Sequence, residues 1–310
     1  MKLIPIIAIS LIIAISCMAD ASIFDTLRDK DKTLAAVLSY EVDDNRVLRI
    51  RFDTPVSITE YRFNNTVISA SYTGNEIILT LPKELGYGEE ATVSLTARKD
   101  NGNATRASLR IEGTNRRLPK MLINELSTDG TGAAPDRAEL YCIAGGCTAG
   151  MVLSDSPAKD GNEVQLPSIE VTQGDIIVVY WDKSANAKDY KRPSGKTVFI
   201  SGKAKATLPS RNGMLTLKSS RQGNIMDAVI YSDSNCSGFS EKAAADARLL
   251  IESGHWSGDA VDSSNITSSR VLARRPGAVD TDTADDWFIT QPRKSTFGEE
   301  NIYAPYTGDE

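Results

Sequence analysis

Alternation of apolar and polar side chains is the feature that most limits what residues 34–112 can fold into. Within residues 47–52, Leu48, Ile50 and Phe52 take every second position, which is the period of a strand that buries one face. Seven such runs follow one another at 35–42, 47–52, 56–63, 67–72, 77–81, 91–97 and 104–111. Because turn-forming residues separate them, the pattern predicts an antiparallel β-sandwich of about seven strands.

The stretch 34–112 resembles the bacterial Ig-like modules of cell-surface proteins. The resemblance is carried by the Arg-Phe-Asp-Thr-Pro-Val run at 51–56 and the Asp-Asn-Gly-Asn turn at 100–103. No tryptophan or cysteine lies between residues 34 and 112, which excludes the core of an antibody domain. The resemblance implies a spacer or adhesion unit, and we expect the polar residues 113–120 to form a linker after it.

The region 121–303 resembles a lamin-tail domain, an Ig-like sandwich found in nuclear lamins and in exported bacterial proteins. Runs at 121–126, 138–141, 151–155, 174–181, 208–217, 223–231, 269–271, 280–287 and 295–301 follow the family's order. The family-motif residues are Asn124, Glu125, Glu139, Asp227 and Trp287. The sequence departs from the family where Cys142 replaces an asparagine and where Thr-Ala-Gly-Met stands at 148–151. The resemblance implies a binding or tethering module with no catalytic residues.

A helical insertion is expected within this second domain. Ser240 can cap a helix, and Gly254 can end it. The residues that would share one face are Ala243, Ala247, Leu250 and Ile251. We expect this helix to pack across the sandwich, with a partner-binding helix as the alternative. The predicted fold class is therefore all-β, with two Ig-like sandwiches in tandem and one short helical insertion in the second.

The N-terminal segment predicts export from the cytoplasm. Lys2 precedes an apolar run at 3–15 and then small residues, which is the order of a signal peptide. Two processing sites compete: a signal-peptidase site at 19–21, and Cys17 in a sequence that resembles the lipobox of bacterial lipoproteins. We therefore expect either a signal peptide at 1–21 or a lipoprotein signal at 1–16 with lipidation of Cys17. In this scheme 22–33 is a linker, and 304–310 is a C-terminal tail.

Export makes a disulfide between Cys142 and Cys147 the expected pairing, because the two glycines between them let the chain reverse. Free buried thiols and half of a metal site remain as alternatives. Cys236 is then left over, either buried or available for intermolecular pairing.

Composition and motif spacing exclude several kinds of chemistry. A single histidine excludes His-rich metal sites, and a net charge of −6 argues against nucleic-acid binding. Gly195-Lys196-Thr197 is not a phosphate loop, because the glycine required five positions earlier is Tyr190 and a strand follows. Asp280 and Asp282 are spaced as in a calcium loop, but Gln291 stands at the twelfth position. We expect an ordinary acidic turn there, with a weak calcium site as the alternative.

The sequence thus predicts an exported cell-envelope protein that binds or scaffolds and does not catalyse. Its expected partner is an envelope or extracellular protein or glycan, with no cofactor, no metal, no nucleic acid, and membrane contact only through a lipid at Cys17. The alternative is a cell-envelope hydrolase in which His255 activates the thiol of Cys236.

Overall fold

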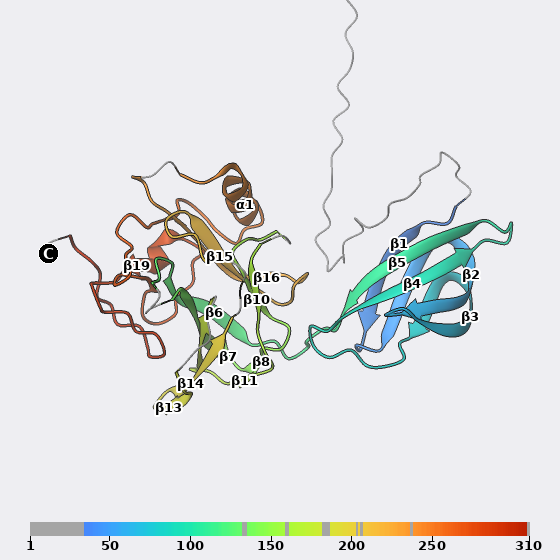
Figure 1. The fold of residues 1–310 in the computed structure, drawn as a ribbon, viewed down its shortest axis with the longest axis horizontal. Coiled ribbons are helices and arrows are strands. Elements are labelled where there is room, and N and C mark those ends of the chain that lie inside the picture. The colour runs from blue at the N-terminus through green and yellow to red at the C-terminus, as the bar shows by residue number, and fades with distance from the viewer. Residues whose placement is uncertain are drawn as a thin grey trace, which may run out of the picture. The chain divides into compact units, whose positions relative to one another are not determined.

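The computed structural model describes residues 34–131, 135–158, 161–181, 187–202, 204, 207–235 and 238–308. These residues form β-strands with one α-helix, which confirms the predicted all-β class (Figure 1). The chain divides into two compact units. Unit 1 contains Met1–Pro82 and Ala91–Ile111, and unit 2 contains Lys83–Glu90 and Glu112–Glu310.

Unit 1 is built on a five-stranded sheet. Its strands are β1 (Val37–Asp43), β2 (Val47–Phe63), β3 (Thr66–Thr80), β4 (Glu90–Arg98) and β5 (Ala104–Glu112). The order is β1-β2-β4-β5, and β3 also pairs with β2. The long β2 therefore pairs with three other strands, with β1 along its first part and with β4 along its last.

Two predicted strand breaks in unit 1 are absent, so five long strands replace the seven expected short ones. β2 continues through Pro55, and β3 continues through Gly74 and Asn75. The register between β2 and β3 shifts between Arg51 and Val56. A proline is tolerated at such a bulge because its missing N–H interrupts no regular ladder bond.

The predicted alternation is confirmed along β2, β4 and β5 of unit 1. Leu48, Ile50 and Phe52 are buried, while the side chains between them are partly or fully exposed. On the other face of the sheet Arg49 forms ion pairs with Asp43 at 3.2 Å and Glu76 at 3.1 Å. The apolar side chains of every second residue thus form the core of this unit.

Unit 2 contains two main sheets and a small one. The seven-stranded sheet has the order β13 (Tyr190–Arg192), β14 (Gly195–Ser201), β12 (Ile176–Tyr180), β7 (Arg137–Ala144), β6 (Lys120–Ser127), β18 (Leu272–Arg274) and β19 (Trp287–Ile289). The five-stranded sheet has the order β10 (Glu163–Gln165), β9 (Val152–Ser154), β15 (Gly213–Lys218), β16 (Ile225–Ser232) and β17 (Val261–Asp262). β8 (Gly146–Cys147) pairs with β11 (Glu170–Val171), and a 3₁₀ turn spans Ala284–Asp286.

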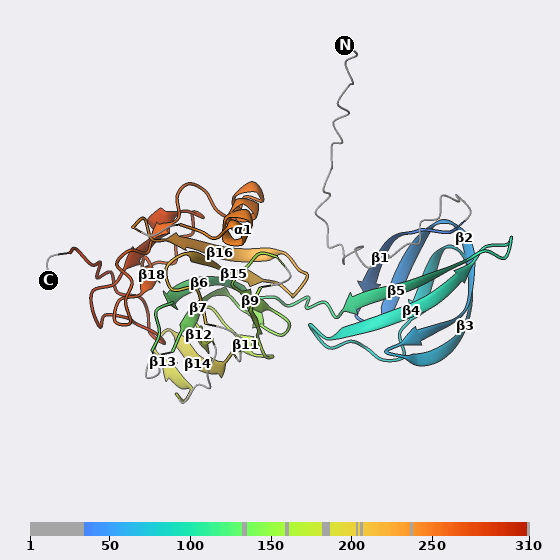
Figure 2. The same cartoon turned by 45° about the horizontal axis from the view of Figure 1, so that its top comes forward.

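The core of unit 2 lies between the two main sheets (Figure 2). One hydrophobic cluster joins Ile123 and Leu140 of the seven-stranded sheet to Leu215 and Ile230 of the five-stranded sheet. Along β7, Ala138, Leu140 and Cys142 belong to this cluster. Glu139 alternates with them and therefore lies on the opposite, outer face of its sheet.

The predicted helix is α1 (Glu241–Glu252), which lies beside β15 and β16 in both ribbon views (Figures 1 and 2). The Ser240 hydroxyl accepts a hydrogen bond from the N–H of Ala243 at 3.2 Å, which confirms the expected cap. The expected helix face is wrong at one position. Ile251 is 47% exposed, and Asp246 is buried in the helix instead.

Residues 113–120, which we expected to be a linker, are folded into unit 2. Asn115 is buried, and its side-chain amide donates to the carbonyl oxygens of Cys147 and Ala149 at 2.6 and 3.0 Å. The carbonyl of Arg117 accepts a bond from the N–H of Cys147 at 2.7 Å. Polar composition alone misled the prediction, because these polar groups bond to the β8 region.

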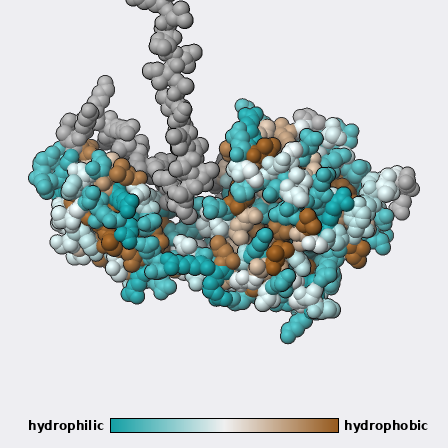
Figure 3. All heavy atoms as spheres, turned by 180° about the vertical axis from the view of Figure 1, so that it is seen from behind, coloured by the Kyte–Doolittle hydropathy of each residue, from teal (hydrophilic) through white to brown (hydrophobic). Residues whose placement is uncertain are grey.

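On the face seen in Figure 3, apolar residues lie in small groups between hydrophilic ones. Within the described part of the chain, no helix combines the length and the apolar character needed to cross a bilayer. The N-terminal segment with Cys17, and the tail residues 309 and 310, lie outside the described residues.

Candidate functional site

Two family-motif carboxylates lie opposite each other on the outer face of the seven-stranded sheet. Glu125 of β6 and Glu139 of β7 are directly paired across the strands. Both are fully buried. Two acids in this position repel each other when both are ionised, so their burial requires donors from elsewhere in the chain.

The C-terminal segment, residues 295–301, supplies most of those donors. The N–H of Thr296 donates to both carboxylate oxygens of Glu125, at 2.9 and 3.0 Å. The N–H of Gly298 donates to Oε2 of Glu139 at 2.5 Å, and Asn124 donates to its Oε1 at 2.7 Å. The two acids and Asn124 therefore bind the C-terminal segment to the sheet.

Burial changes the acidity of both carboxyl groups. Desolvation raises the pKa of Glu125 from 4.5 to about 7, although the hydrogen bonds from Thr296 act to lower this pKa. Desolvation, and then the charge of Glu125, raise the pKa of Glu139 to about 8. The pair is therefore sensitive to pH near neutrality.

Arg274 connects the other family-motif residues in a second buried cluster. Its guanidinium donates to both carboxylate oxygens of Asp227, at 3.1 and 3.0 Å, and to the carbonyl of Ile123 at 2.9 Å. The ring of Trp287 lies 4.8 Å from the guanidinium carbon. Burial raises the pKa of Asp227, and the charge of Arg274 opposes that rise. This buried ion pair connects β16 of one sheet to β6 and β18 of the other.

The acidic turn at 280–286 approaches the same arginine. Carboxylate oxygens of Asp227, Asp280 and Asp282 lie within 4.8 Å of one another, a spacing that a metal ion can fill. Arg274 donates to Asp280 at 2.9 Å, so a protein cation already compensates two of these charges. Asp286 accepts bonds from Thr281 and closes the turn that leads to the buried Trp287, as predicted.

The predicted disulfide between Cys142 and Cys147 is wrong, because both thiols are free in the structure. The Cys142 thiol donates to the carbonyl of Ala144 at 3.3 Å, and Cys147 Sγ lies 3.4 Å from the hydroxyl of Ser168. The chain between the cysteines passes from β7 to β8, which pairs with β11. Burial raises the pKa of Cys142 to about 11, so its thiol is protonated at neutral pH.

The sequence alternative for catalysis pairs Cys236 with His255. Cys236 lies outside the described residues, so the structure does not place it beside His255. The backbone N–H of His255 bonds to the carbonyl of Leu250 after helix α1. Gly195–Ser201 is a strand, as we expected when we excluded a phosphate loop there.

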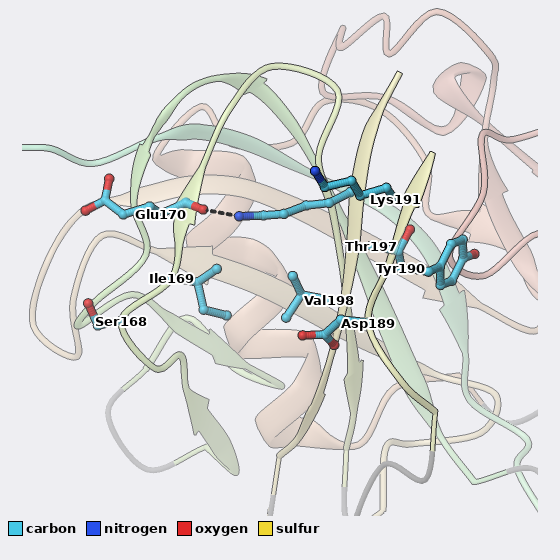
Figure 4. Close-up of a pocket in the computed structure, with 9 residues that line it drawn as sticks. Ser168, Ile169, Glu170, Asp189, Tyr190, Lys191, Thr197 and Val198 are labelled. Carbon is cyan, nitrogen blue, oxygen red and sulfur yellow. Dashed lines mark hydrogen bonds between the residues drawn. The ribbon is translucent and has the colours of Figure 1, made fainter. Parts of the chain in front are cut away.

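A surface groove of about 600 Å³ lies in unit 2 between the β13–β14 hairpin and the start of β11 (Figure 4). Its lining residues are Ser168, Ile169, Glu170, Asp189, Tyr190, Lys191, Lys196, Thr197 and Val198. Ile169 and Val198 point toward each other across the groove (Figure 4). The ammonium of Lys196 donates to the carbonyl oxygen of Glu170 at 2.6 Å.

Two groups that line the groove also contact the C-terminal segment. The hydroxyls of Tyr190 and Thr197 donate to the carbonyl of Gly298, at 2.8 and 2.6 Å. The N–H of the same glycine bonds to Glu139. A Cβ at Gly298 would lie 2.8 Å from the Tyr190 hydroxyl, and its φ is +90°, so this position requires glycine. Gly298 thus links the buried acids to the strands that form the groove.

Residues 119–289 match a family model named TP_1001_2nd and described as a protein second domain. The match covers more than half of the chain and lies within unit 2. The chain belongs to this family. The TP_1001_2nd region contains both buried clusters and the whole groove, whereas the C-terminal segment follows it in the sequence.

No curated protein matches this chain. A crystal structure of a DUF4876 family protein from Bacteroides thetaiotaomicron is similar with a TM-score of 0.37 and 10% identity, covering 82% of this chain and 94% of that chain.

Sequence reasoning did not select Arg274, Lys191 or Lys196 as site residues. One signal was available for Arg274, which follows the apolar run at 271–273 in a strand. A charged residue in a buried strand needs a partner of opposite charge. No comparable signal marks the two lysines, because only the pairing of β13 with β14 brings them together.

Proposed function

We propose that this chain is a non-catalytic binding or scaffolding protein of the cell envelope, in which unit 2 contacts the partner and unit 1 is a spacer. The observation that carries the proposal is the burial of the polar family-motif residues. Asn124, Glu125, Glu139 and Asp227 are each at most 5% exposed, and their side chains bond to the chain itself. Side chains that are buried and bonded to the chain itself stabilise the fold. A partner would therefore bind at the surface groove of unit 2.

The identities of the two units belong to the same proposal. The lamin-tail assignment of unit 2 is supported by two facing β-sheets with one inserted helix, and by the burial of all five family-motif residues. The Ig-like assignment of unit 1 is supported by long strands with alternating burial. A module of this kind presents loops and strand edges to partners.

Export to the envelope rests on the N-terminal sequence. The apolar run at 3–15 after Lys2 has the organisation of a signal peptide, and Cys17 supplies a lipidation site. Mass spectrometry of the mature N-terminus separates the two forms. A diacylated Cys17 identifies an anchored lipoprotein, and an N-terminus after residue 21 identifies a soluble exported form.

Photo-crosslinking in intact producing cells tests the binding role. A photoreactive amino acid replaces Ser168, an exposed residue of the groove, and a matched control replaces Ser71, an exposed residue of β3 in unit 1. We expect one envelope component to be captured through position 168 and not through position 71. Capture of unspecific neighbours at both positions would contradict the proposal.

The same cells test the rival hydrolase function of Cys236 and His255. The Cys236→Ala chain should capture the partner and support growth as the wild type does. If the Cys236→Ala chain remains folded but loses a hydrolytic activity of the wild type, the protein is a hydrolase.

A further inference from the structure

We propose that the groove between the β13–β14 hairpin and the start of β11 binds an acidic peptide segment in extended conformation, through the ammonium groups of Lys191 and Lys196. This inference rests on the proposed function, since it names the chemistry of the partner segment that unit 2 would contact. It is argued from four features of the groove: a pair of like charges, the pairing of its acids, an apolar floor and two strand edges.

The like charges are an unfavourable local arrangement that an anion would relieve. Lys191 and Lys196 are direct cross-strand partners in the β13–β14 hairpin. Like charges placed directly opposite each other destabilise a strand pair. Lys191 is exposed and forms no hydrogen bond or ion pair with the described residues. Departures from local stability rules of this kind are concentrated at functional sites.

The acids that line the groove form no ion pair with Lys191. The carboxylate of Glu170 points away from the groove in Figure 4 and forms two bonds to Arg117, at 3.1 and 2.7 Å. The carboxylate of Asp189 accepts a bond from the N–H of Phe199 at 3.0 Å. Lys196 donates to a carbonyl oxygen and forms an ion pair with the buried Asp175 at 3.9 Å. Lys191 is therefore the lysine of the groove whose ammonium has no carboxylate partner among the described residues, in a chain whose net charge is −6.

The floor and the edges of the groove favour a peptide over other polyanions. Ile169 and Val198 are half-buried and offer an apolar floor to a small side chain. β13 ends the order of the seven-stranded sheet, and β11 pairs with β8 alone among the described strands. Free strand edges present backbone donors and acceptors that an extended peptide can match. Lysine side chains on an edge strand oppose pairing with an uncharged strand. The edge of β13 therefore favours a peptide strand that carries carboxylates.

Fluorescence anisotropy with the full mature chain tests this proposal. The probe is a short labelled peptide in which aspartate and valine alternate, and its control replaces each aspartate by asparagine. We expect the acidic peptide to bind, and its affinity to fall with added salt. Lys191→Gln should weaken binding about tenfold, and the additional change Lys196→Gln should abolish it.

A matched variant and a second polyanion define the results that overturn the proposal. Lys294→Gln removes the same charge at an exposed site outside the groove and should leave binding unchanged. Equal loss in Lys191→Gln and Lys294→Gln would show a nonspecific charge effect. Equal binding of the asparagine peptide, or tighter binding of inorganic polyphosphate, would also refute an acidic peptide as the ligand.

Cell crosslinking separates this inference from the proposed function. A partner captured through position 168 by the wild type should be lost in the double variant Lys191→Glu and Lys196→Glu. If the double variant captures the same partner equally well, the groove proposal fails while the binding role remains. If the wild type captures no specific partner, the binding role itself fails.

Discussion

The buried acid pair beneath the C-terminal segment makes the stability of unit 2 depend on pH. Burial raises the pKa of Glu139 from 4.5 in the unfolded chain to about 8. Between these values the folded state holds one more proton at Glu139, so the free energy of unfolding falls by about 1.4 kcal/mol per pH unit. Glu125, with a pKa raised to about 7, adds a similar slope up to that pH.

The two slopes set the size of the expected effect. Between about pH 5 and about pH 7, the two carboxyl groups together lower the free energy of unfolding by up to about 5 kcal/mol. The loss occurs as pH rises, because the folded state must then bury carboxylates that the unfolded chain exposes to water. At about pH 5 and below, both groups are protonated in the folded state and this loss is small.

Glu139→Gln isolates one of the two slopes. The amide cannot accept from both Gly298 and Asn124, so we expect a constant cost of about 1–3 kcal/mol at every pH. The diagnostic quantity is the slope of unfolding free energy against pH, which should become shallower by about 1.4 kcal/mol per pH unit. Glu252→Gln, at an exposed site on α1, is the matched control and should keep the wild-type slope.

Urea unfolding followed by tryptophan fluorescence measures these slopes in unit 2 alone. The three tryptophans, Trp181, Trp256 and Trp287, all lie in this unit. A stability that stays constant or rises between about pH 5 and about pH 7, or an unchanged slope in Glu139→Gln, would refute the reasoning.

Three further predictions concern features that do not involve the groove. Arg274→Met leaves the carboxylate of Asp227 buried without its partner and should cost about 3–5 kcal/mol in urea unfolding, with partial recovery in the double variant Arg274→Met, Asp227→Leu. An equal cost in the single and double variants would contradict the ion-pair account. Ser240→Ala removes the α1 cap and should lower stability by about 1 kcal/mol, a value checked by the same unfolding curves. In a chain that lacks the other cysteines, Cys142 and Cys147 should react with a thiol reagent only after unfolding. A reductant should leave the melting temperature of this chain unchanged. If the two thiols react only after a reductant has been added, they form a disulfide and the prediction is wrong.

Local patterns in the sequence predicted most strands, because alternation reports directly on burial of one face. The prediction from local patterns failed where a turn-forming residue lies inside a strand. Pro55 is an example, because β2 continues through it without a break. It failed again at Cys142 and Cys147, where two glycines permit a reversal but the second cysteine pairs with β11 instead. Strand continuity and cysteine pairing depend on which strand, distant in the sequence, packs beside the segment in the fold.

The candidate sites depend even more on long-range pairing. The family resemblance identified Glu125, Glu139 and Asp227, but not the cation that neutralises Asp227. Arg274 bonds to Asp227, which lies 47 positions earlier in the sequence. The lysine pair of the groove arises from the register of a short hairpin, and periodicity in three residues of β13 carries too little information to place it.

The contact of the buried acids with the C-terminal segment affects the order in which the chain can mature. Glu125 bonds to Thr296, 171 positions later, and Asn124 to Asn301, 177 positions later. During synthesis, β6 and β7 emerge long before the donors that permit their acids to be buried, so unit 2 stays incomplete until its last segment is made. For a chain that we propose to be exported, such a delay would favour passage through a narrow membrane pore before folding is complete.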